Sequence, residues 1–412
     1  MRFDKYSIAP EIKENLKTNG YFRTTDIQYK TIPAIMDGED VLAIAQTGSG
    51  KTAAFAIPII NEIHESKTNK RDHSIQCLIL VPTRELAQQI GSVIAKLSKS
   101  TRATSYAVYG GIDQDPQIAQ LAGGVDILVA TPGRMFDLIK QRHIEISNVK
   151  ILVLDEADRM LDLGFIDDIE AIKKRLLRRH QTLFFSATIN PKIKKLAYSQ
   201  IKANALRIQV SPSEMVSKNI THSIAKVEMD DKRNLLVRFL NANPDAKSII
   251  FVRTQVRAER VSAHLAKNSI QSVNLHGGMV QAEREKNLET FRGLASGVLI
   301  ATDVTARGID LPGITHVINY DIPDNPENYV HRIGRTGRGF AKGLAISFCS
   351  PEEAEKLAQI ESLIETKINE LKIHEEHLQP EPVVDVESIS ISKMLEIEEA
   401  HFESPRKRKK KR

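Results

Sequence analysis

Short apolar runs alternate with amphipathic stretches along most of this 412-residue chain. The amphipathic stretches include residues 84–96 and 167–177, in which apolar residues recur with the spacing of a helix. Strand-sized runs separated by helices predict a parallel α/β sheet that is covered on both faces. In the first half of the chain, the predicted strands are residues 41–45, 77–81, 103–109, 127–130, 151–154, 183–186 and 206–210.

The alternation pauses at residues 211–219, SPSEMVSKN, where we predict a linker. It resumes beyond them, so the sequence predicts two α/β domains, at residues 1–210 and 220–371. From residue 372 the chain turns acidic and then basic, which predicts a mostly disordered tail with a short helix near residues 392–400. In the second domain, the predicted strands are residues 248–252, 272–275, 298–302, 316–320 and 344–348, and a last helix is predicted from about residue 352 to 367.

The positive charge of the chain is concentrated at one end. Lys and Arg number 58 against 52 Asp and Glu, but the last seven residues are all basic, which leaves 51 basic residues against 52 acidic ones elsewhere. A near-neutral body argues against a basic packaging protein. For the tail, two interpretations stay open: a solubilising end, or a tether that raises the local concentration of a nucleic acid.

Two distant cysteines, Cys77 and Cys349, exclude a disulfide framework and a cysteine-type zinc site. The N-terminal residues contain no signal-like apolar stretch, and the chain contains no run of 18 apolar residues. We therefore expect a cytoplasmic protein.

Residues 45–52, AQTGSGKT, lie between the first predicted strand and a helix-compatible run. They nearly match a phosphate-binding loop, with Ala45 at the usual first glycine. Backbone N–H groups at Gly48 and Gly50 would surround phosphates, Lys51 would reach the β/γ oxygens, and Thr52 would hold Mg²⁺. The alternative, a Gly-rich turn with a surface lysine, is disfavoured by the order of strand, loop and helix. The candidate nucleotide-binding residues here are Ala45, Gln46, Thr47, Gly48, Ser49, Gly50, Lys51 and Thr52.

Residues 151–158, ILVLDEAD, combine a buried strand with an acidic end. Asp155 falls at the carboxyl end of the strand, where open α/β sheets bind ligands. We predict that Asp155 holds magnesium and that Glu156 orients or deprotonates the attacking water. Alone, such an acidic quartet is more often a solvated turn, but together with Lys51 it indicates a nucleotide hydrolase.

The second domain lacks a phosphate loop but contains HRIGRTGR at residues 331–338. A basic surface loop is the plain alternative for this segment. With one phosphate site in the first domain, however, Arg335 and Arg338 are better explained as fingers on the γ-phosphate, in a cleft that must close for catalysis.

With these motifs in order, the chain resembles the DEAD-box ATP-dependent RNA helicases, which are named for the tetrapeptide at residues 155–158. The resemblance spans residues 1–370, and its motif wording is most similar to the bacterial RhlE-like proteins. It implies two tandem RecA-like domains, ATP and Mg²⁺ as cofactors, and RNA as substrate. It also makes ribosomal and RNA-decay complexes candidate partners, for a chain expected to be a monomer.

Upstream, GYFRTTDIQ at residues 20–28 resembles the Q motif of the family, with Phe3 seventeen residues before Gly20. The Gln28 amide can donate to and accept from the N6/N7 edge of adenine, which would select ATP over GTP. By resemblance, Tyr21 and Arg23 lie against the base. Residues 24–26, Thr-Thr-Asp, stand where the family usually has Pro-Thr-Pro, which leaves the rigidity of this loop open.

Resemblance also implies the residues for RNA contact and for coupling between the domains. Ser186 and Thr188 would connect the γ-phosphate site to closure by bonding Asp158 and His331, and Asp303 would contact the ribose. The predicted RNA-contacting turns offer N–H groups, hydroxyls and guanidinium to the RNA backbone rather than to base edges. They contain Pro82, Thr83, Arg84, Gly110, Gly111, Thr131, Pro132, Gly133, Arg134, Arg253, Thr254, Gly277, Gln281, Arg284, Thr302 and Arg307.

The predicted function is that of an RNA-stimulated ATPase that locally melts short RNA duplexes when ATP and RNA together close two domains. Two other functions use similar motifs. One is an ATP-dependent RNA clamp or assembly scaffold that stays bound. The other is a DNA translocase, against which the DEAD-type motifs argue.

Overall fold

The computed structural model describes residues 1–45, 48–67, 74–210, 216–306, 309, 311–337 and 341–371. The predicted site residues that lie outside the described residues are Gln46, Thr47, Arg307 and Arg338. Most of the predicted linker, residues 211–215, and the whole predicted tail, residues 372–412 with its short helix, lie outside them as well.

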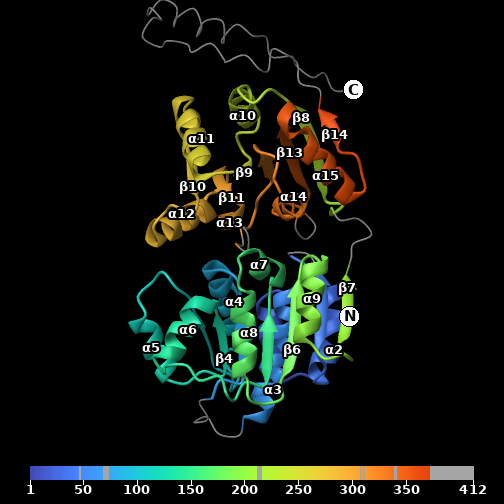
Figure 1. The fold of residues 1–412 in the computed structure, drawn as a ribbon, viewed down its shortest axis with the longest axis vertical. Coiled ribbons are helices and arrows are strands. Elements are labelled where there is room, and N and C mark those ends of the chain that lie inside the picture. The colour runs from blue at the N-terminus through green and yellow to red at the C-terminus, as the bar shows by residue number, and fades with distance from the viewer. Residues whose placement is uncertain are drawn as a thin grey trace, which may run out of the picture. The chain divides into compact units, whose positions relative to one another are not determined.

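Lobe 1, residues 1–210, contains a seven-stranded sheet in which every neighbouring pair is parallel, in the order β3-β4-β2-β5-β6-β1-β7 (Figure 1). Its strands are β1 Val41–Ala45, β2 Cys77–Leu80, β3 Ser105–Val108, β4 Ile127–Ala130, β5 Ile151–Leu154, β6 Gln181–Ser186 and β7 Leu206–Val210. Its helices are η1 Phe3–Lys5, α1 Pro10–Thr18, α2 Asp26–Met36, α3 Lys51–Ser66, α4 Arg84–Leu97, α5 Asp115–Ala122, α6 Pro132–Lys140, α7 Ala157–Asp162, α8 Ile166–Arg175 and α9 Pro191–Gln200.

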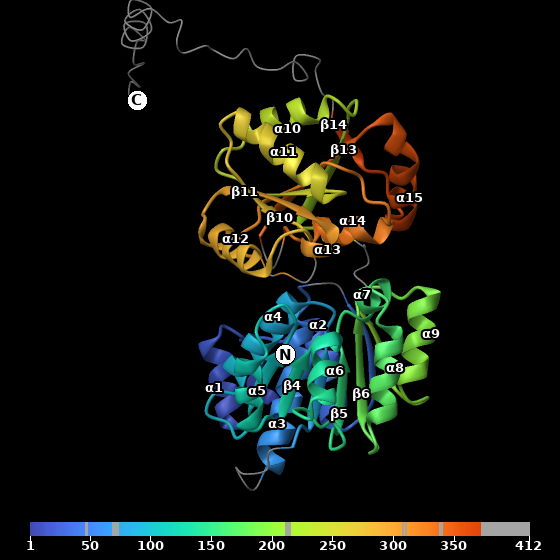
Figure 2. The ribbon, with the colours of Figure 1, turned by 60° about the vertical axis from the view of Figure 1, so that its left-hand side comes forward.

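Both faces of this sheet are buried, as continuous apolar strands require. Alternate residues of a strand point to opposite faces: in β1, Val41 and Ala43 belong to a core with α1–α4, whereas Leu42 and Ile44 belong to a second core with α6–α9. Figure 2 shows helices flanking the strands of this sheet.

Lobe 2, residues 216–371, repeats this design with a second all-parallel sheet in the order β10-β11-β9-β12-β13-β8-β14. Its strands are β8 Ile220–Lys226, β9 Lys247–Val252, β10 Ser272–Leu275, β11 Gly297–Thr302, β12 His316–Asn319, β13 Gly343–Cys349 and β14 Asn369–Leu371. Its helices are α10 Lys232–Asn241, α11 Gln255–Lys267, α12 Gln281–Gly293, α13 Asp303–Ala306, α14 Pro326–Ile333, η2 Pro351–Glu353 and α15 Ala354–Ile364.

The two sheets have the same strand order when the strands of each lobe are counted from its own first strand. This confirms the predicted pair of parallel α/β sheets. Two strands were missed, β8 and β14, and the predicted strand at residues 103–109 is shorter, at Ser105–Val108.

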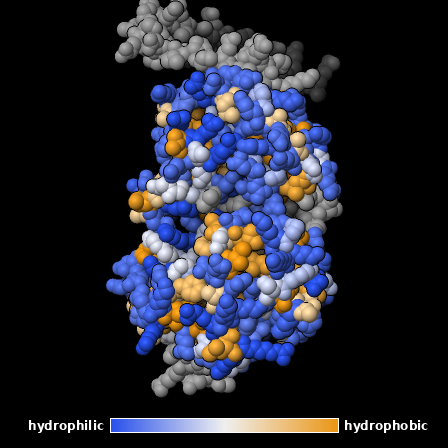
Figure 3. Space-filling model, viewed as in Figure 1, coloured by the Kyte–Doolittle hydropathy of each residue, from blue (hydrophilic) through white to orange (hydrophobic). Residues whose placement is uncertain are grey.

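Loops that follow the strands gather at the carboxyl edge of each parallel sheet, where α/β proteins bind ligands. The surface view in Figure 3 is mostly hydrophilic, with apolar side chains gathered over α7 and the start of α8, where Leu163 is exposed and Leu161, Phe165 and Ile166 are partly buried. Within the described ranges, no helix is both long and apolar enough to cross a bilayer.

Candidate active site and RNA-binding surface

The phosphate loop connects β1 to the first residue of α3. Gly48 and Gly50 have φ values of +82° and +92°, the left-handed conformation that lets backbone N–H groups converge. Lys51 is buried, and its ammonium donates to the Ala45 carbonyl at 2.8 Å, at the end of β1. Lys51 is therefore the first residue of α3, next to the loop that it was predicted to serve, and Thr52 follows it half-buried.

Gln28 connects the Q motif to this loop. Its side-chain oxygen accepts from Thr25 N at 2.9 Å in a capping box at the start of α2, and its Nε2 donates to Gly50 O at 3.1 Å. A Cβ on Gly50 would lie 2.5 Å from that Nε2 and would displace the Gln28 amide, and the φ of +92° itself favours glycine. An amide has two N–H groups and two lone pairs, so one of each remains for the edge of adenine. Tyr21 is half-buried against the lobe 1 core, and Arg23 is exposed.

Asp155 follows β5 directly and is buried, with its Oδ1 accepting from Glu156 N at 3.0 Å. Burial raises the pKa of the Asp155 carboxyl to about 6, although the Lys51 ammonium lowers it. Glu156 caps α7 with φ +53°, a strained conformation for a residue with a side chain. Its carboxylate lies 3.5 Å from the Arg159 guanidinium. Such strain is often retained where a side chain must be aimed.

Asp158 bonds to the segment that follows β6. Its Oδ2 accepts from Ala187 N and Thr188 N, both at 3.1 Å, and from the Thr188 hydroxyl at 3.3 Å. The Ser186 hydroxyl instead donates to the Thr188 carbonyl at 2.8 Å. The predicted connection between Asp158 and this segment is therefore present, and it rests chiefly on backbone N–H groups.

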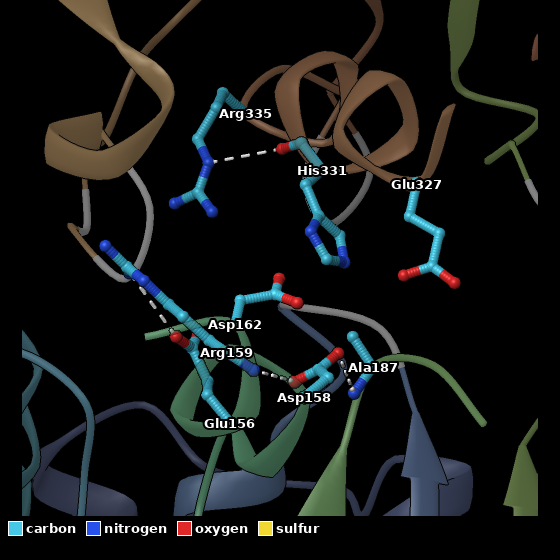
Figure 4. A pocket seen from close by; sticks show the side chains of 8 residues that line it. All are labelled: Glu156, Asp158, Arg159, Asp162, Ala187, Glu327, His331 and Arg335. Atoms are coloured by element: carbon cyan, nitrogen blue, oxygen red, sulfur yellow. Dashed lines mark hydrogen bonds and ion pairs between the residues drawn. The ribbon is translucent and has the colours of Figure 1, made fainter. Parts of the chain in front are cut away.

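A pocket brings residues of both lobes together. It is lined in lobe 1 by Glu156, side chains of α7 and Ala187, and in lobe 2 by side chains of α14 and the turn after it (Figure 4). Arg335 is buried; its Nη1 donates to Ile309 O at 2.8 Å and its Nε donates to His331 O at 3.4 Å. The full lining is Glu156, Asp158, Arg159, Asp162, Ala187, Glu327, His331 and Arg335.

Arg332 of HRIGRTGR is buried in lobe 2 and contacts several of its segments. Its guanidinium binds both carboxylate oxygens of Asp303, at 2.5 and 2.7 Å, and donates to Asp321 O at 2.7 Å. Its guanidinium carbon also lies 5.1 Å from the centre of the Phe251 ring. Asp303, the predicted ribose-contacting residue, is thus fixed in orientation by a bidentate pair.

The predicted RNA-contacting turns of lobe 1 begin helices. Thr83 caps α4 by accepting from Leu86 N, and Thr131 precedes α6, whose first residue is Pro132. Gly111 has φ +81°, which favours glycine, and a Cβ there would lie 1.7 Å from the Arg84 guanidinium and would displace it. Gly110 directly precedes Gly111, and Gly133 is the second residue of α6. Arg134 donates to Ile112 O at 2.8 Å.

In lobe 2, Thr254 caps α11 and Arg253 pairs with Glu353 at 3.0 Å. Gly277 lies in the turn after β10, and Thr302, at the end of β11, bonds the Thr305 hydroxyl at 3.0 Å. These residues lie at the carboxyl edge of the second sheet.

Two contacts between the lobes involve predicted RNA-binding residues. Arg84 Nη1 donates to Gln281 Oε1 at 3.0 Å, and Arg284 Nε lies 2.6 Å from Glu85 Oε1. The ends of α4 and α12 therefore meet, and the arginines predicted to grip RNA also connect the lobes.

Sequence reasoning missed Glu85, Arg159 and Glu327. A signal existed for two of them: Arg159 lies three residues after Glu156, and Glu327 lies four residues before His331, so each shares a helix face with a predicted residue. Glu85 gives no such signal, because its partner is in the other lobe.

Comparison with known proteins agrees with this geometry. The model of the DEAD/DEAH box helicase family matches residues 25–196, and that of the helicase conserved C-terminal domain matches residues 231–339. The DEAD-box ATP-dependent RNA helicase RhpA of Helicobacter pylori is 40% identical over 371 residues, which cover 90% of this chain and 74% of RhpA. The chain belongs to the DEAD-box helicases. It is an ATP-dependent RNA helicase, an enzyme that hydrolyses ATP.

Other members of this helicase family agree. The DEAD-box ATP-dependent RNA helicase CshA of Bacillus subtilis is 39% identical over 370 residues, 90% of this chain and 74% of CshA. Among solved structures, S. cerevisiae Dbp5 bound to RNA and ADP BeF3 is 30% identical with a TM-score of 0.79, covering 90% of this chain and 95% of Dbp5. Mss116p bound to ssRNA and AMP-PNP is 28% identical with a TM-score of 0.82, covering 91% and 80%.

Proposed function

We propose that lobe 1 binds ATP with Gln28 on adenine and the loop at residues 45–52 around the phosphates. The remaining donor and acceptor of Gln28 and the left-handed glycines of the loop support this assignment. Tyr21 and Arg23 would lie against the base, and Asp303 of lobe 2 would contact the ribose.

We propose that Thr52 and Asp155 hold Mg²⁺. A buried carboxylate whose pKa is raised by burial fits a cation, and Mg²⁺ typically uses only one or two protein oxygens beside those of phosphate. When bound, the ion supplies charge neutralisation at the β- and γ-phosphate oxygens. Lys51 adds a second positive charge there, while Glu156 orients the attacking water.

We propose that Arg335, Arg338 and His331 complete the catalytic site from lobe 2. The observation that supports this is the pocket in which Glu156 and Asp158 face His331 and Arg335. A guanidinium presented to the γ-phosphate accelerates hydrolysis by about 10³–10⁵. Hydrolysis then depends on the two lobes being together.

We propose that RNA lies along the carboxyl edges of both sheets and is gripped through its backbone. Helix-capping turns and arginines at both edges support sequence-independent binding. ATP and RNA together favour the closed arrangement, in which one strand follows a path that a duplex cannot adopt. Hydrolysis then allows RNA to be released and the enzyme to turn over. Asp158 and residues 186–188 connect the nucleotide site to this change in the arrangement of the lobes.

The experiment that tests this function measures ATP hydrolysis with and without RNA, and duplex melting, for the wild type and Lys51→Ala. We expect RNA to stimulate hydrolysis and Lys51→Ala to abolish both activities.

An RNA clamp is the second candidate function, because the contacts between the lobes use residues that are also proposed to bind RNA. RNA dissociation in ATP that is slower than duplex melting would favour it. Competition by DNA as effective as by RNA would instead favour a DNA translocase.

We further propose a cytoplasmic location, a monomeric state and a role for the tail. Both cysteines are buried free thiols, which suits a reducing cytoplasm. A monomer that acts on ribosomal or RNA-decay complexes, in the manner of an RhlE-like helicase, is tested by sedimentation and by crosslinking to cellular RNA. A tail that tethers RNA predicts a smaller salt dependence of RNA binding after residues 404–412 are deleted.

A further inference from the structure

The loop that precedes Gln28 has little intrinsic rigidity. Residues 20–25 contain no proline and begin at Gly20, whose φ is +79°. Phe22 and Arg23 are exposed, so packing does not fix the middle of the loop. Yet Gln28 must be held closely to discriminate one purine edge from another. Contacts with other parts of lobe 1 therefore help to fix the loop that precedes Gln28.

The N-terminal residues supply the support. Thr24 N donates to the Met1 carbonyl at 2.9 Å, and the Thr24 hydroxyl donates to the same oxygen at 3.2 Å. Arg2 and Arg23 form an antiparallel β-bridge beside these bonds. A single backbone carbonyl thus accepts both polar hydrogens of Thr24.

The N-terminal residues are themselves anchored in the lobe 1 core. Phe3 is buried there, and its ring centre lies 6.2 Å from that of Tyr6, which is also buried. Further along, Ala9 N donates to Asn61 Oδ1 of α3 at 2.8 Å. The Met1 carbonyl is therefore connected to the same body that carries the phosphate loop.

A continuous set of bonds then leads to the nucleotide site. It runs from the Met1 carbonyl to Thr24, through the adjacent Thr25 to Gln28, and from Gln28 to the Gly50 carbonyl in the phosphate loop. We propose that the Met1 carbonyl and Thr24 are positioning groups for purine recognition: they hold Gln28 where it selects ATP over GTP. This inference rests on the proposed role of Gln28.

Deletion of Arg2 from a protein expressed with Met1 as its first residue tests the proposal, because Met1 then takes the place of Arg2 and no carbonyl is left to accept from Thr24. We expect the KM for ATP to rise by about three- to tenfold, the size of effect expected for one or two hydrogen bonds. The KM for GTP and the kcat at saturating ATP and RNA should hardly change. Thr24→Val, which removes only the hydroxyl, should give a smaller loss of ATP preference, and Lys5→Ala in the same segment should give none.

Rescue separates positioning from general support of the fold. Proline presets φ and needs no acceptor, so Thr24→Pro combined with the Arg2 deletion should restore the ATP preference. An equal rise of KM for ATP and GTP, or a failure of Thr24→Pro to restore the preference while thermal unfolding is unchanged, would overturn the proposal.

Gln28→Glu distinguishes failure of the support from failure of the Gln28 assignment. Glutamate keeps the capping box but loses the amide donor. If Gln28→Glu keeps the ATP preference, the adenine assignment is wrong. If it loses the preference while deletion of Arg2 does not, only the role of the N-terminal residues is wrong.

Discussion

Glu85 of α4 and Arg284 of α12 form an ion pair across the two lobes, with 2.6 Å between Glu85 Oε1 and Arg284 Nε. Both side chains are largely buried, and burial lowers the pKa of Arg284 while Glu85 opposes that shift. Removing one partner of such a pair leaves the other charge buried and uncompensated. The pair should therefore favour the arrangement in which the lobes meet.

Glu85→Gln should weaken RNA binding in the presence of a non-hydrolysable ATP analogue by about tenfold or more, because it removes a buried charge partner. RNA binding without nucleotide should change much less, since the lobes need not be together. Titration of a fluorescent single-stranded RNA measures both affinities. Glu289→Gln, an exposed change on α12, serves as the control, and equal losses with and without nucleotide would contradict the prediction.

Glu156→Gln should bind RNA in ATP but lose multiple turnover, because the amide cannot accept a proton from water. The rate of RNA dissociation in ATP and a steady-state phosphate assay measure the two properties. Glu170→Gln, exposed on α8, should keep both. Release of RNA by Glu156→Gln as fast as by the wild type would make the assignment wrong.

Arg335→Lys should lower the RNA-stimulated kcat by about 10²-fold or more, with the KM for ATP within about threefold, since lysine keeps the charge but not the planar fork. Steady-state hydrolysis at saturating RNA checks this. Arg260→Ala, on the exposed face of α11, is the matched control. An intact RNA response in Arg335→Ala would exclude the finger.

Asp158→Asn should uncouple the two lobes more strongly than Thr188→Val. Asp158 Oδ2 accepts two backbone bonds at 3.1 Å and one longer hydroxyl bond at 3.3 Å, and Asp158 Oδ1 accepts from Arg159 N at 3.1 Å, so Thr188→Val removes only the longest of these four bonds. We expect Asp158→Asn to reduce duplex melting per ATP hydrolysed by about fivefold or more, and Thr188→Val by about twofold or less. A reversed order would show that the hydroxyl has another partner during catalysis.

Asp155 makes the stability of the nucleotide-free protein depend on pH. Its pKa is about 6 in the fold against an ordinary value of 3.8, so the folded state holds the proton more tightly. Stability contributed by the protonated group is complete below pH 3.8 and is lost as the pH rises through 6. Asp155→Asn, which cannot ionise, should therefore raise the Tm of the nucleotide-free protein at pH 7.5 and do so less at pH 5. The same substitution should abolish the Tm rise caused by ATP with Mg²⁺, which calorimetry measures.

Most of the fold follows from the continuous apolar runs, because a strand buried on both faces leaves a clear signal. The exceptions lie toward one edge of the second sheet. The three residues of β14 are all exposed, so no apolar pattern identifies them. In β8, the polar His222 interrupts the apolar run. Its Nδ1 bonds the buried Tyr329 hydroxyl at 2.9 Å, and this partner lies 107 residues away in the sequence.

The site likewise contains features that the sequence could predict and others that it could not. The positions of Lys51, Asp155 and Glu156 after buried strands could be predicted, because each lies in a contiguous motif that follows an apolar run. The contacts of Glu85 with Arg284 and of Arg84 with Gln281 were not, since they depend on how two distant segments meet. The support of Thr24 by Met1 was equally hidden, because it involves a backbone carbonyl that no residue type identifies.

The shared strand order of the two sheets has a consequence for stoichiometry. The helix after the first strand begins with lysine in both lobes, Lys51 in α3 and Lys232 in α10. Lys232 is fully buried, donates to Tyr320 O at 2.9 Å and pairs with Glu353. Its ammonium is therefore neutralised by an internal carboxylate and is not available to a triphosphate. Among the described residues, the second lobe therefore offers no available lysine at this position to a triphosphate, and we expect a binding stoichiometry of one ATP per chain.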